Sequence, residues 1–284
     1  DPGRYFVFDK AAKTLAEVML VRPELEKRAL ATVKPVSVRA TDGTTIPAYL
    51  TLPVGSSGKS LPAVVLPHGG PSARDEWGFD WLAQFLAARG YAVLQPNYRG
   101  SAGFGDAWLM QNGFKSWKTS IGDITASAKW LASEGIADPD RIAVVGWSYG
   151  GYAALQSGVV EPTLFKAVAA IAPVTDLGML KGEYNRYTTE RMVRDFIGSG
   201  THIEQGSPLK RAAEIRCFSS TATWTRMSES VQGPRSPARR QRSATRNADG
   251  HRHLAREDDR TLTKKGGAIR TAPFVSSWSK NQRE

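Results

Sequence analysis

The stretch Arg141-Ile142-Ala143-Val144-Val145-Gly146-Trp147-Ser148-Tyr149-Gly150 decides the fold. An apolar strand delivers Ser148 to a sharp turn, and a helix beginning near residues 152–155 leaves from it. Glycine is required at Gly146 and Gly150, because a Cβ at either place would collide with the neighbouring strand or helix. The pattern predicts a nucleophile elbow with Ser148 as the catalytic nucleophile.

A second motif upstream, Leu66-Pro67-His68-Gly69-Gly70-Pro71, follows the apolar run 63–66. A His-Gly-Gly segment at the end of an early strand supplies backbone N–H groups to a developing oxyanion in many α/β-hydrolases. We expect the N–H groups of Tyr149 and Gly70 to be the donors. His68 is expected to be a structural imidazole that pins its loop, since the base of this fold follows the serine in the chain.

Apolar runs alternate with helical patterns along the middle of the chain. Such alternation is typical of a mostly parallel sheet covered by helices on both faces, as in the α/β-hydrolase fold. We expect strands at residues 63–66, 91–95, 141–145 and 165–172, helices at residues 81–89 and 121–133, and hairpins pairing residues 4–9 with 16–20 and 36–40 with 46–52. The pattern stops after Arg216, so we expect a fold truncated or disrupted at its C-terminal strands.

Three segments carry a resemblance to a known family. They are His68-Gly69-Gly70-Pro71 with residues 74–80, then Asn97-Tyr98-Arg99-Gly100-Ser101 with residues 102–105, then residues 146–152. Together they resemble the catalytic domain of the prolyl oligopeptidase family, on its acylaminoacyl-peptidase and dipeptidyl-peptidase side, from about Val36 to Arg216. The resemblance implies a serine peptidase that acts on short peptides and carries a β-propeller domain in front of the hydrolase.

The resemblance also implies a division of the chain. Residues 1–20 would be the remnant of a preceding propeller blade, residues 21–36 a linker, and residues 37–216 an incomplete catalytic domain. Residues 217–284 would be a basic tail outside the family pattern. The rest of the propeller domain is expected to be missing from this chain.

The last quarter of the chain differs from the rest in composition. Residues 217–284 hold 14 of the 38 Lys and Arg but only 6 of the 27 Asp and Glu, so most of the net charge of +11 lies there. Only 18 of these 68 residues are hydrophobic, with no period of 2 or 3.6. Such a segment is unable to bury a core.

The genetic code suggests a frameshift after about Arg216. Read one base out of register, residues 218–230 permit Leu-Leu-Phe-His-Gly-Asp-(Leu/Met/Val)-Asp-Gln-Asn-Val-Gly-Val. One aspartate is forced, because the only Trp codon ends in G and Thr codons begin with AC, so Trp224-Thr225 yields GAC. The resemblance places the acid of the catalytic triad there, in His-Gly-x-x-Asp. A genuine divergent tail is the alternative, and the origin of residues 231–284 stays open.

A hydrolase of this class needs a histidine that takes the proton of the serine and an aspartate that orients that histidine. His202 lies in a loop before the expected strand, and no apolar strand presents His251 or His253. We therefore expect the chain to retain Ser148 and the oxyanion elements and to lack the acid and base. The alternatives are a carboxylesterase without a propeller partner and a non-catalytic pseudohydrolase.

Other features narrow the class of protein. No apolar run approaches the roughly 20 residues of a membrane span, and the basic tail has no interleaved aromatic residues, so we expect neither membrane nor nucleic-acid binding. The single cysteine, Cys217, allows no intramolecular disulfide. No metal and no cofactor are expected. The chain does not begin with Met and shows no leader, and a cytoplasmic location is favoured.

Several charged residues have ordinary structural interpretations. Asp123 is expected on a helix face, and Asp138 and Asp140 in a turn and cap. Arg74 and Asp75 are expected to form an exposed ion pair, with the lining of a substrate entrance as the alternative.

Overall fold

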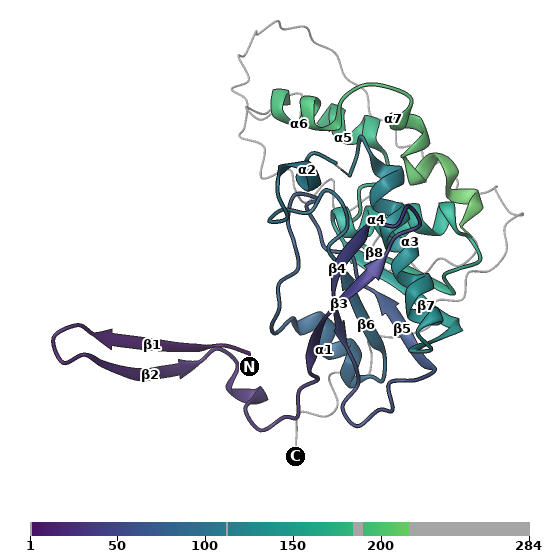
Figure 1. Ribbon diagram of the computed structural model, residues 1–284. Helices are drawn as coiled ribbons and strands as arrows, with labels where there is room; N and C mark the ends of the chain where they lie inside the picture. The colour runs from purple at the N-terminus through teal and green to yellow at the C-terminus, as the bar shows by residue number, and fades with distance from the viewer. Residues whose placement is uncertain (1, 112, 184–189, 216–284) are drawn as a thin grey trace, which may run out of the picture. The chain divides into compact units, whose positions relative to one another are not determined.

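The structure, a computed structural model, describes residues 2–111, 113–183 and 190–215. Its central element is a six-stranded sheet of order β3-β4-β6-β5-β7-β8 (Figure 1). The strands of this sheet are β3 Val33–Arg39, β4 Thr45–Thr51, β5 Leu61–Val65, β6 Ala92–Pro96, β7 Ala137–Trp147 and β8 Ala167–Ile171. β6, β5, β7 and β8, in that order, pair parallel to one another. The hairpin β3–β4 extends the sheet at its other edge, where β4 pairs antiparallel with β6. The expected mostly parallel sheet is confirmed.

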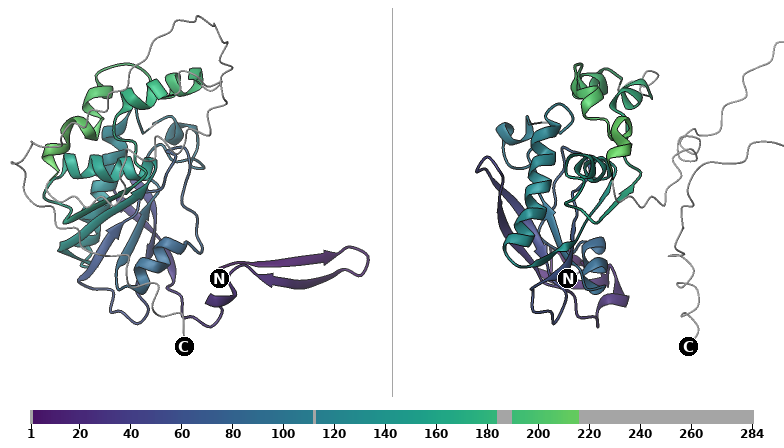
Figure 2. Two further views of the ribbon diagram at one scale, coloured as in Figure 1. Left: turned by 180° about the vertical axis from the view of Figure 1, so that it is seen from behind. Right: turned by 90° about the vertical axis from the view of Figure 1, so that its right-hand side faces the viewer.

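Helices cover both faces of this sheet (Figure 2). The helices of the described residues are α1 Trp81–Ala88, α2 Asp106–Leu109, α3 Trp117–Ser133, α4 Tyr149–Val160, α5 Leu177–Glu183, α6 Glu190–Ile197 and α7 His202–Gln205, with short 3-10 turns at Pro23–Leu25 and Pro208–Glu214. α1 packs on one face of the sheet, and α3 and α4 pack on the other. α1 begins where the sequence indicates, because the Asp80 carboxylate accepts a hydrogen bond from the N–H of Ala83 at 2.7 Å.

The apolar strands divide their side chains between the two faces with period 2. Val64 and Val93 pack with Ala83 of α1 in a small cluster. Val65 and Leu94 pack in the main core with α3 and α4. Because both faces are covered, these strands read as continuous apolar runs in the sequence.

β8 is the last strand of the sheet within the described residues. Ile215, where the described chain ends, packs against the main core near β8. A Cβ at Gly158 would lie 3.5 Å from Ile215 Cγ2 and 3.0 Å from Val168 Cγ2. The described chain therefore ends beside β8. The sequence analysis expects the next strand of the fold to begin at this point of the chain.

The N-terminal hairpin consists of β1, Arg4–Asp9, paired antiparallel with β2, Thr14–Leu20. Its pairing agrees with the expected hairpin, but the apolar side chains of both strands are exposed, among them Phe6 and Val18. The assignment of residues 1–20, 21–36 and 37–216 to three parts of a longer protein stays a prediction, and residues 217–284 lie outside the described residues. No helix in the described ranges is long and apolar enough to cross a membrane.

Candidate active site

Ser148 occupies a strained turn between β7 and α4. Its φ of 57° and ψ of −118° lie outside the regions that non-glycine residues usually adopt. The turn is tied on both sides, because Ser148 N donates to Ile171 O of β8 at 2.9 Å and Ser148 O accepts from Tyr152 N at 3.0 Å. The backbone therefore holds Ser148 exposed at the carboxyl end of β7, in the geometry of a nucleophile elbow.

The two glycines of the elbow lie in contact with backbone atoms. A Cβ at Gly146 would lie 2.1 Å from Gly150 O, and a Cβ at Gly150 would lie 2.2 Å from Pro67 O. Real Cβ atoms essentially never come so close to another atom. Only glycine fits at either position, and the elbow packs directly against the end of β5.

The loop after β5 lies beside the serine. A Cβ at Gly69 would lie 3.7 Å from Ser148 Cβ and 3.3 Å from Trp147 O. Tyr149 is the first residue of α4, so its N–H has no acceptor within the helix and the positive helix end is next to Ser148. Gly70, with φ 122°, instead contacts the turn that follows it, since a Cβ there would lie 2.8 Å from Ser72 N. The roles of Tyr149 and Gly70 as oxyanion donors stay predictions.

His68 is held by the loop that follows β6. Its ring stacks on Tyr98 with 4.4 Å between centroids, and its Nε2 lies 2.8 Å from Ser101 Oγ. Its Nδ1 lies 2.7 Å from Gly69 O, and the Tyr98 hydroxyl donates to His68 O at 2.8 Å. Burial lowers the pKa of His68 to about 4, although the bond to Gly69 opposes this shift. The imidazole is therefore neutral at pH 7.

The side chain of Tyr149 anchors the elbow in the core. It is buried, packs edge-on to Phe114 with 5.0 Å between centroids, and places its hydroxyl 3.2 Å from Ser120 Oγ. A Cβ at Gly113 would lie only 1.9 Å from this hydroxyl. Burial raises the pKa of Tyr149, so the phenol stays protonated. These contacts fix the residue whose N–H is the expected oxyanion donor.

The described histidines do not supply a base for Ser148. His68 contacts Ser101, and His202 Nε2 lies 2.7 Å from Ile197 O; neither bonds Ser148. His251, His253 and the expected site of the triad acid lie outside the described residues. Within the described ranges, no cluster of three His, Cys, Asp or Glu could hold a metal ion.

The expectation of an exposed ion pair between Arg74 and Asp75 is wrong. Arg74 pairs with Glu76 at 2.8 Å and not with Asp75. Asp75 is partly buried, with its Oδ2 removed from solvent, and its Oδ1 accepts from Gln95 at 3.2 Å. Burial, together with the charge of nearby Asp80, raises the pKa of Asp75 to about 7. The sequence did not reveal this environment of Asp75, because it arises when the loop after β5 folds onto the end of β6.

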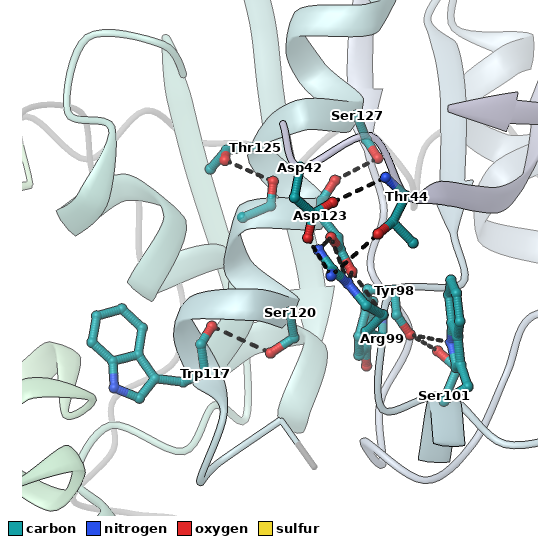
Figure 3. Close-up of polar contacts among 12 residues, drawn as sticks. Asp42, Thr44, Tyr98, Arg99, Ser101, Trp117, Ser120, Asp123, Thr125 and Ser127 are labelled. Carbon is teal, nitrogen blue, oxygen red and sulfur yellow. Dashed lines mark hydrogen bonds and ion pairs between the residues drawn. The ribbon is translucent and has the colours of Figure 1, made fainter. Parts of the chain in front are cut away.

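Asp123 lies on α3, as expected, but on its buried face, where its side chain is completely removed from solvent. It accepts hydrogen bonds from the backbone and the guanidinium of Arg99, which also pairs with Asp42 (Figure 3). The sequence held one signal for this cluster, since Tyr98, Arg99 and Ser101 lie within five residues of the end of a mostly apolar strand. Polar residues at the carboxyl ends of parallel strands gather at one edge of the sheet.

A strained serine at a strand-to-helix turn, beside a glycine-rich loop on an α/β sheet, defines the class of serine hydrolases. The comparisons with known proteins specify the group. A model of the Prolyl oligopeptidase family matches residues 77–223, about half of the chain. The chain belongs to this family of serine peptidases.

Individual relatives agree with this assignment. Dipeptidyl aminopeptidase BIII of Pseudoxanthomonas mexicana is 34% identical over 231 residues, which cover 76% of this chain and 33% of that protein. Dipeptidyl peptidase family member 6 of Caenorhabditis elegans is 36% identical over 187 residues, covering 58% of this chain and 25% of the relative. The chain spans a third or less of these relatives.

Solved structures show the same fold. A puromycin-hydrolyzing peptidase of Mycobacterium tuberculosis superposes with a TM-score of 0.67 at 27% identity, covering 77% of this chain and 35% of that one. An acylaminoacyl peptidase, bound to a chloromethyl ketone, superposes with a TM-score of 0.64 at 20% identity, covering 76% and 35%. The expected α/β-hydrolase fold is confirmed.

Proposed function

We propose that Ser148 is the nucleophile of a peptidase that hydrolyses short peptides through an acyl-enzyme. The observation that carries this proposal is the strained turn of Ser148 against Gly69. The backbone N–H groups of the loop around Gly69 and of the first turn of α4 can donate hydrogen bonds to a carbonyl oxygen as negative charge develops on it. The neutral, partly buried His68 supports its loop and leaves the proton transfer to another group.

In the proposed reaction, Ser148 Oγ attacks the carbonyl carbon and a histidine base takes the hydroxyl proton. The tetrahedral intermediate collapses with transfer of that proton to the leaving amine, which breaks the peptide bond and leaves an ester on Ser148. Water then attacks the ester with the same base accepting its proton, and the base returns that proton to Ser148 Oγ as the acyl–oxygen bond breaks and the acid leaves. The base and its aspartate would come from the region after residue 215.

We further propose that the chain as written lacks this base and aspartate because its reading frame is shifted after about Arg216. The forced aspartate at Trp224-Thr225 supports this proposal. The position of Ile215 beside Val168 supports it too, because the chain has arrived at β8 when the family pattern ends. Sequencing the encoding DNA around Arg216 tests it directly.

We also propose that residues 1–20 belong to the end of a propeller blade in a longer protein. β1 and β2 pair only with each other among the described strands, and their apolar side chains are exposed. A lone hairpin is marginal in water. The chain also spans only about a third of a relative such as the P. mexicana enzyme.

The decisive experiment compares three chains: the chain as written, a chain with the reading frame restored after Arg216, and that restored chain carrying Ser148→Ala. Each is assayed with a chromogenic dipeptide and with a simple ester. We expect turnover of the dipeptide by the restored chain alone. Equal peptidase activity in the chain as written would refute the frameshift and make His251 or His253 the base.

Two other outcomes would favour the remaining functions. Cleavage of only the ester by the restored chain would favour a carboxylesterase. A restored chain that folds but cleaves neither substrate would favour a pseudohydrolase.

A further inference from the structure

Arg99 joins three segments of the chain at the carboxyl edge of the sheet (Figure 3). Its Nη2 lies 2.6 Å from Asp123 Oδ1 on α3, and its Nη1 pairs with Asp42 in the turn between β3 and β4. Its own backbone N–H donates to Asp123 Oδ2 at 2.9 Å. One buried carboxylate therefore fixes both the main chain and the side chain of Arg99.

The two residues that hold His68 flank Arg99 closely in the sequence. Tyr98 precedes Arg99, stacks on the His68 ring and donates its hydroxyl hydrogen to His68 O. Ser101 follows two residues later and contacts His68 Nε2. The position of this short loop therefore sets the position of His68.

His68 is followed directly by Gly69, the residue that lies against Ser148. We infer that Arg99 is a positioning residue for the active site, which holds the His68-Gly69 segment against Ser148 through Tyr98 and Ser101. The inference rests on the proposed role of Ser148 as a nucleophile. In this role the Arg99–Asp123 pair positions the His68-Gly69 segment as well as holding α3 to the sheet.

The charges around Arg99 favour this role. The Asp123 side chain is fully buried and the Arg99 side chain is only 12% exposed, whereas the Asp42 side chain is 52% exposed. A bidentate pair removed from water has a narrow range of geometries. The inner Asp123 arm therefore holds the loop most strongly, and the outer Asp42 arm restrains the same guanidinium from the solvent side.

Lysine at position 99 retains a positive charge but not the planar fork, so Arg99→Lys tests the geometry of the network. The first measurement is the titration of the His68 ring by NMR, with its signal assigned by a His68→Gln variant. We expect a midpoint of about 4 in the unmodified chain. In Arg99→Lys we expect a midpoint higher by about one unit or more, because a released ring becomes hydrated.

The second measurement is the rate at which a fluorophosphonate modifies Ser148, relative to the Ser148→Ala background. We expect a slow but detectable rate in the unmodified chain. In Arg99→Lys we expect this rate to fall between about tenfold and 100-fold, since misplacement by about 1 Å has effects of that size. The matched control is Lys129→Gln, which breaks the exposed pair with Glu161 away from this loop and should change neither measurement.

A folded Arg99→Lys chain with unchanged titration and unchanged modification rate would overturn the inference alone. If Ser148 of the unmodified chain reacts no faster than the Ser148→Ala background, the proposed role of Ser148 as a nucleophile is refuted. The inference about Arg99 then falls with it. If Arg99→Lys does not fold, Asp42→Asn loosens Arg99 from the exposed side. That variant must then raise the His68 midpoint and slow the modification at least about twofold, and no change in either would refute the inference.

Discussion

The Gly150→Ala substitution gives the sharpest test of the elbow. Gly150 lies in the first turn of α4 and does not have a left-handed φ, so alanine causes no backbone strain of its own. The added Cβ would lie 2.2 Å from Pro67 O, 3.1 Å from His68 O and 3.2 Å from the His68 carbonyl carbon. All three are backbone atoms at the end of β5, so no side-chain rotation relieves the contact.

The size of the effect follows from these distances. Ordinary contact begins at 3.4 Å, so Pro67 O and the Cβ must separate by about 1.2 Å. Overpacking of this kind costs up to about 3 kcal/mol of folding free energy. Alanine returns about 1 kcal/mol through its higher helix propensity. The net loss is about 2 kcal/mol, or a melting temperature lower by about 4–8 °C for a domain of this size.

Thermal unfolding followed by circular dichroism measures the loss, with Gly122→Ala as the matched control. Gly122 lies in α3, and a Cβ there would meet nothing within 4 Å. We expect the control to raise the melting temperature by about 2–4 °C through helix propensity alone. A Gly150→Ala chain that melts within about 1 °C of the unmodified chain would refute the steric account of the elbow.

Three further predictions concern buried polar groups. Asp123→Asn should lower the free energy of unfolding by up to about 3–5 kcal/mol in urea titrations, because it removes the buried carboxylate partner of Arg99 and leaves the half-exposed Asp42 to compensate its charge; a loss below about 1 kcal/mol would contradict the assigned pairing. The folded-state pKa of Asp75, about 7, lies above its ordinary value of 3.8, so the folded chain binds more protons between these values. Stability should therefore fall as pH rises from about 4 to 7, and urea titrations should show a flatter profile in Asp75→Asn; equal slopes would contradict this. The Tyr152 hydroxyl is buried without a hydrogen-bond partner among the described residues. Tyr152→Phe should therefore increase the free energy of unfolding by about 1–3 kcal/mol, seen as a higher urea midpoint. A lower midpoint would show that the hydroxyl has a partner.

Much of the architecture could be predicted from the sequence. The expected strand at residues 91–95 is β6, Ala92–Pro96, and the expected helix at residues 81–89 is α1, Trp81–Ala88. The ends of elements differ more from expectation, since α3 begins at Trp117, four residues before the expected start. Apolar periodicity is a local signal, so it predicts elements well and fixes their ends less well.

The candidate site divides in the same way. The elbow around Ser148 could be predicted because a tight turn needs glycine at fixed offsets from the serine. The burial of Asp75 and the pair between Arg99 and Asp123 could not. Their partners lie 20 and 24 residues away in the chain, and no local pattern reports such contacts.

The sequence by itself determined the class of fold, because apolar periodicity and the spacing of a few glycines around Ser148 are local patterns. From the same patterns it predicts the nucleophile and a loss of the family pattern after about Arg216. Only the tertiary structure decided that the carboxylates of Asp75 and Asp123 are shielded from solvent, and which residues they bond there. The carboxyl ends of β5, β6 and β7 converge at one edge of the sheet, and that convergence brings His68, Arg99 and Ser148 into one connected site. Burial and pairing there depend on strand order, which a linear pattern does not contain.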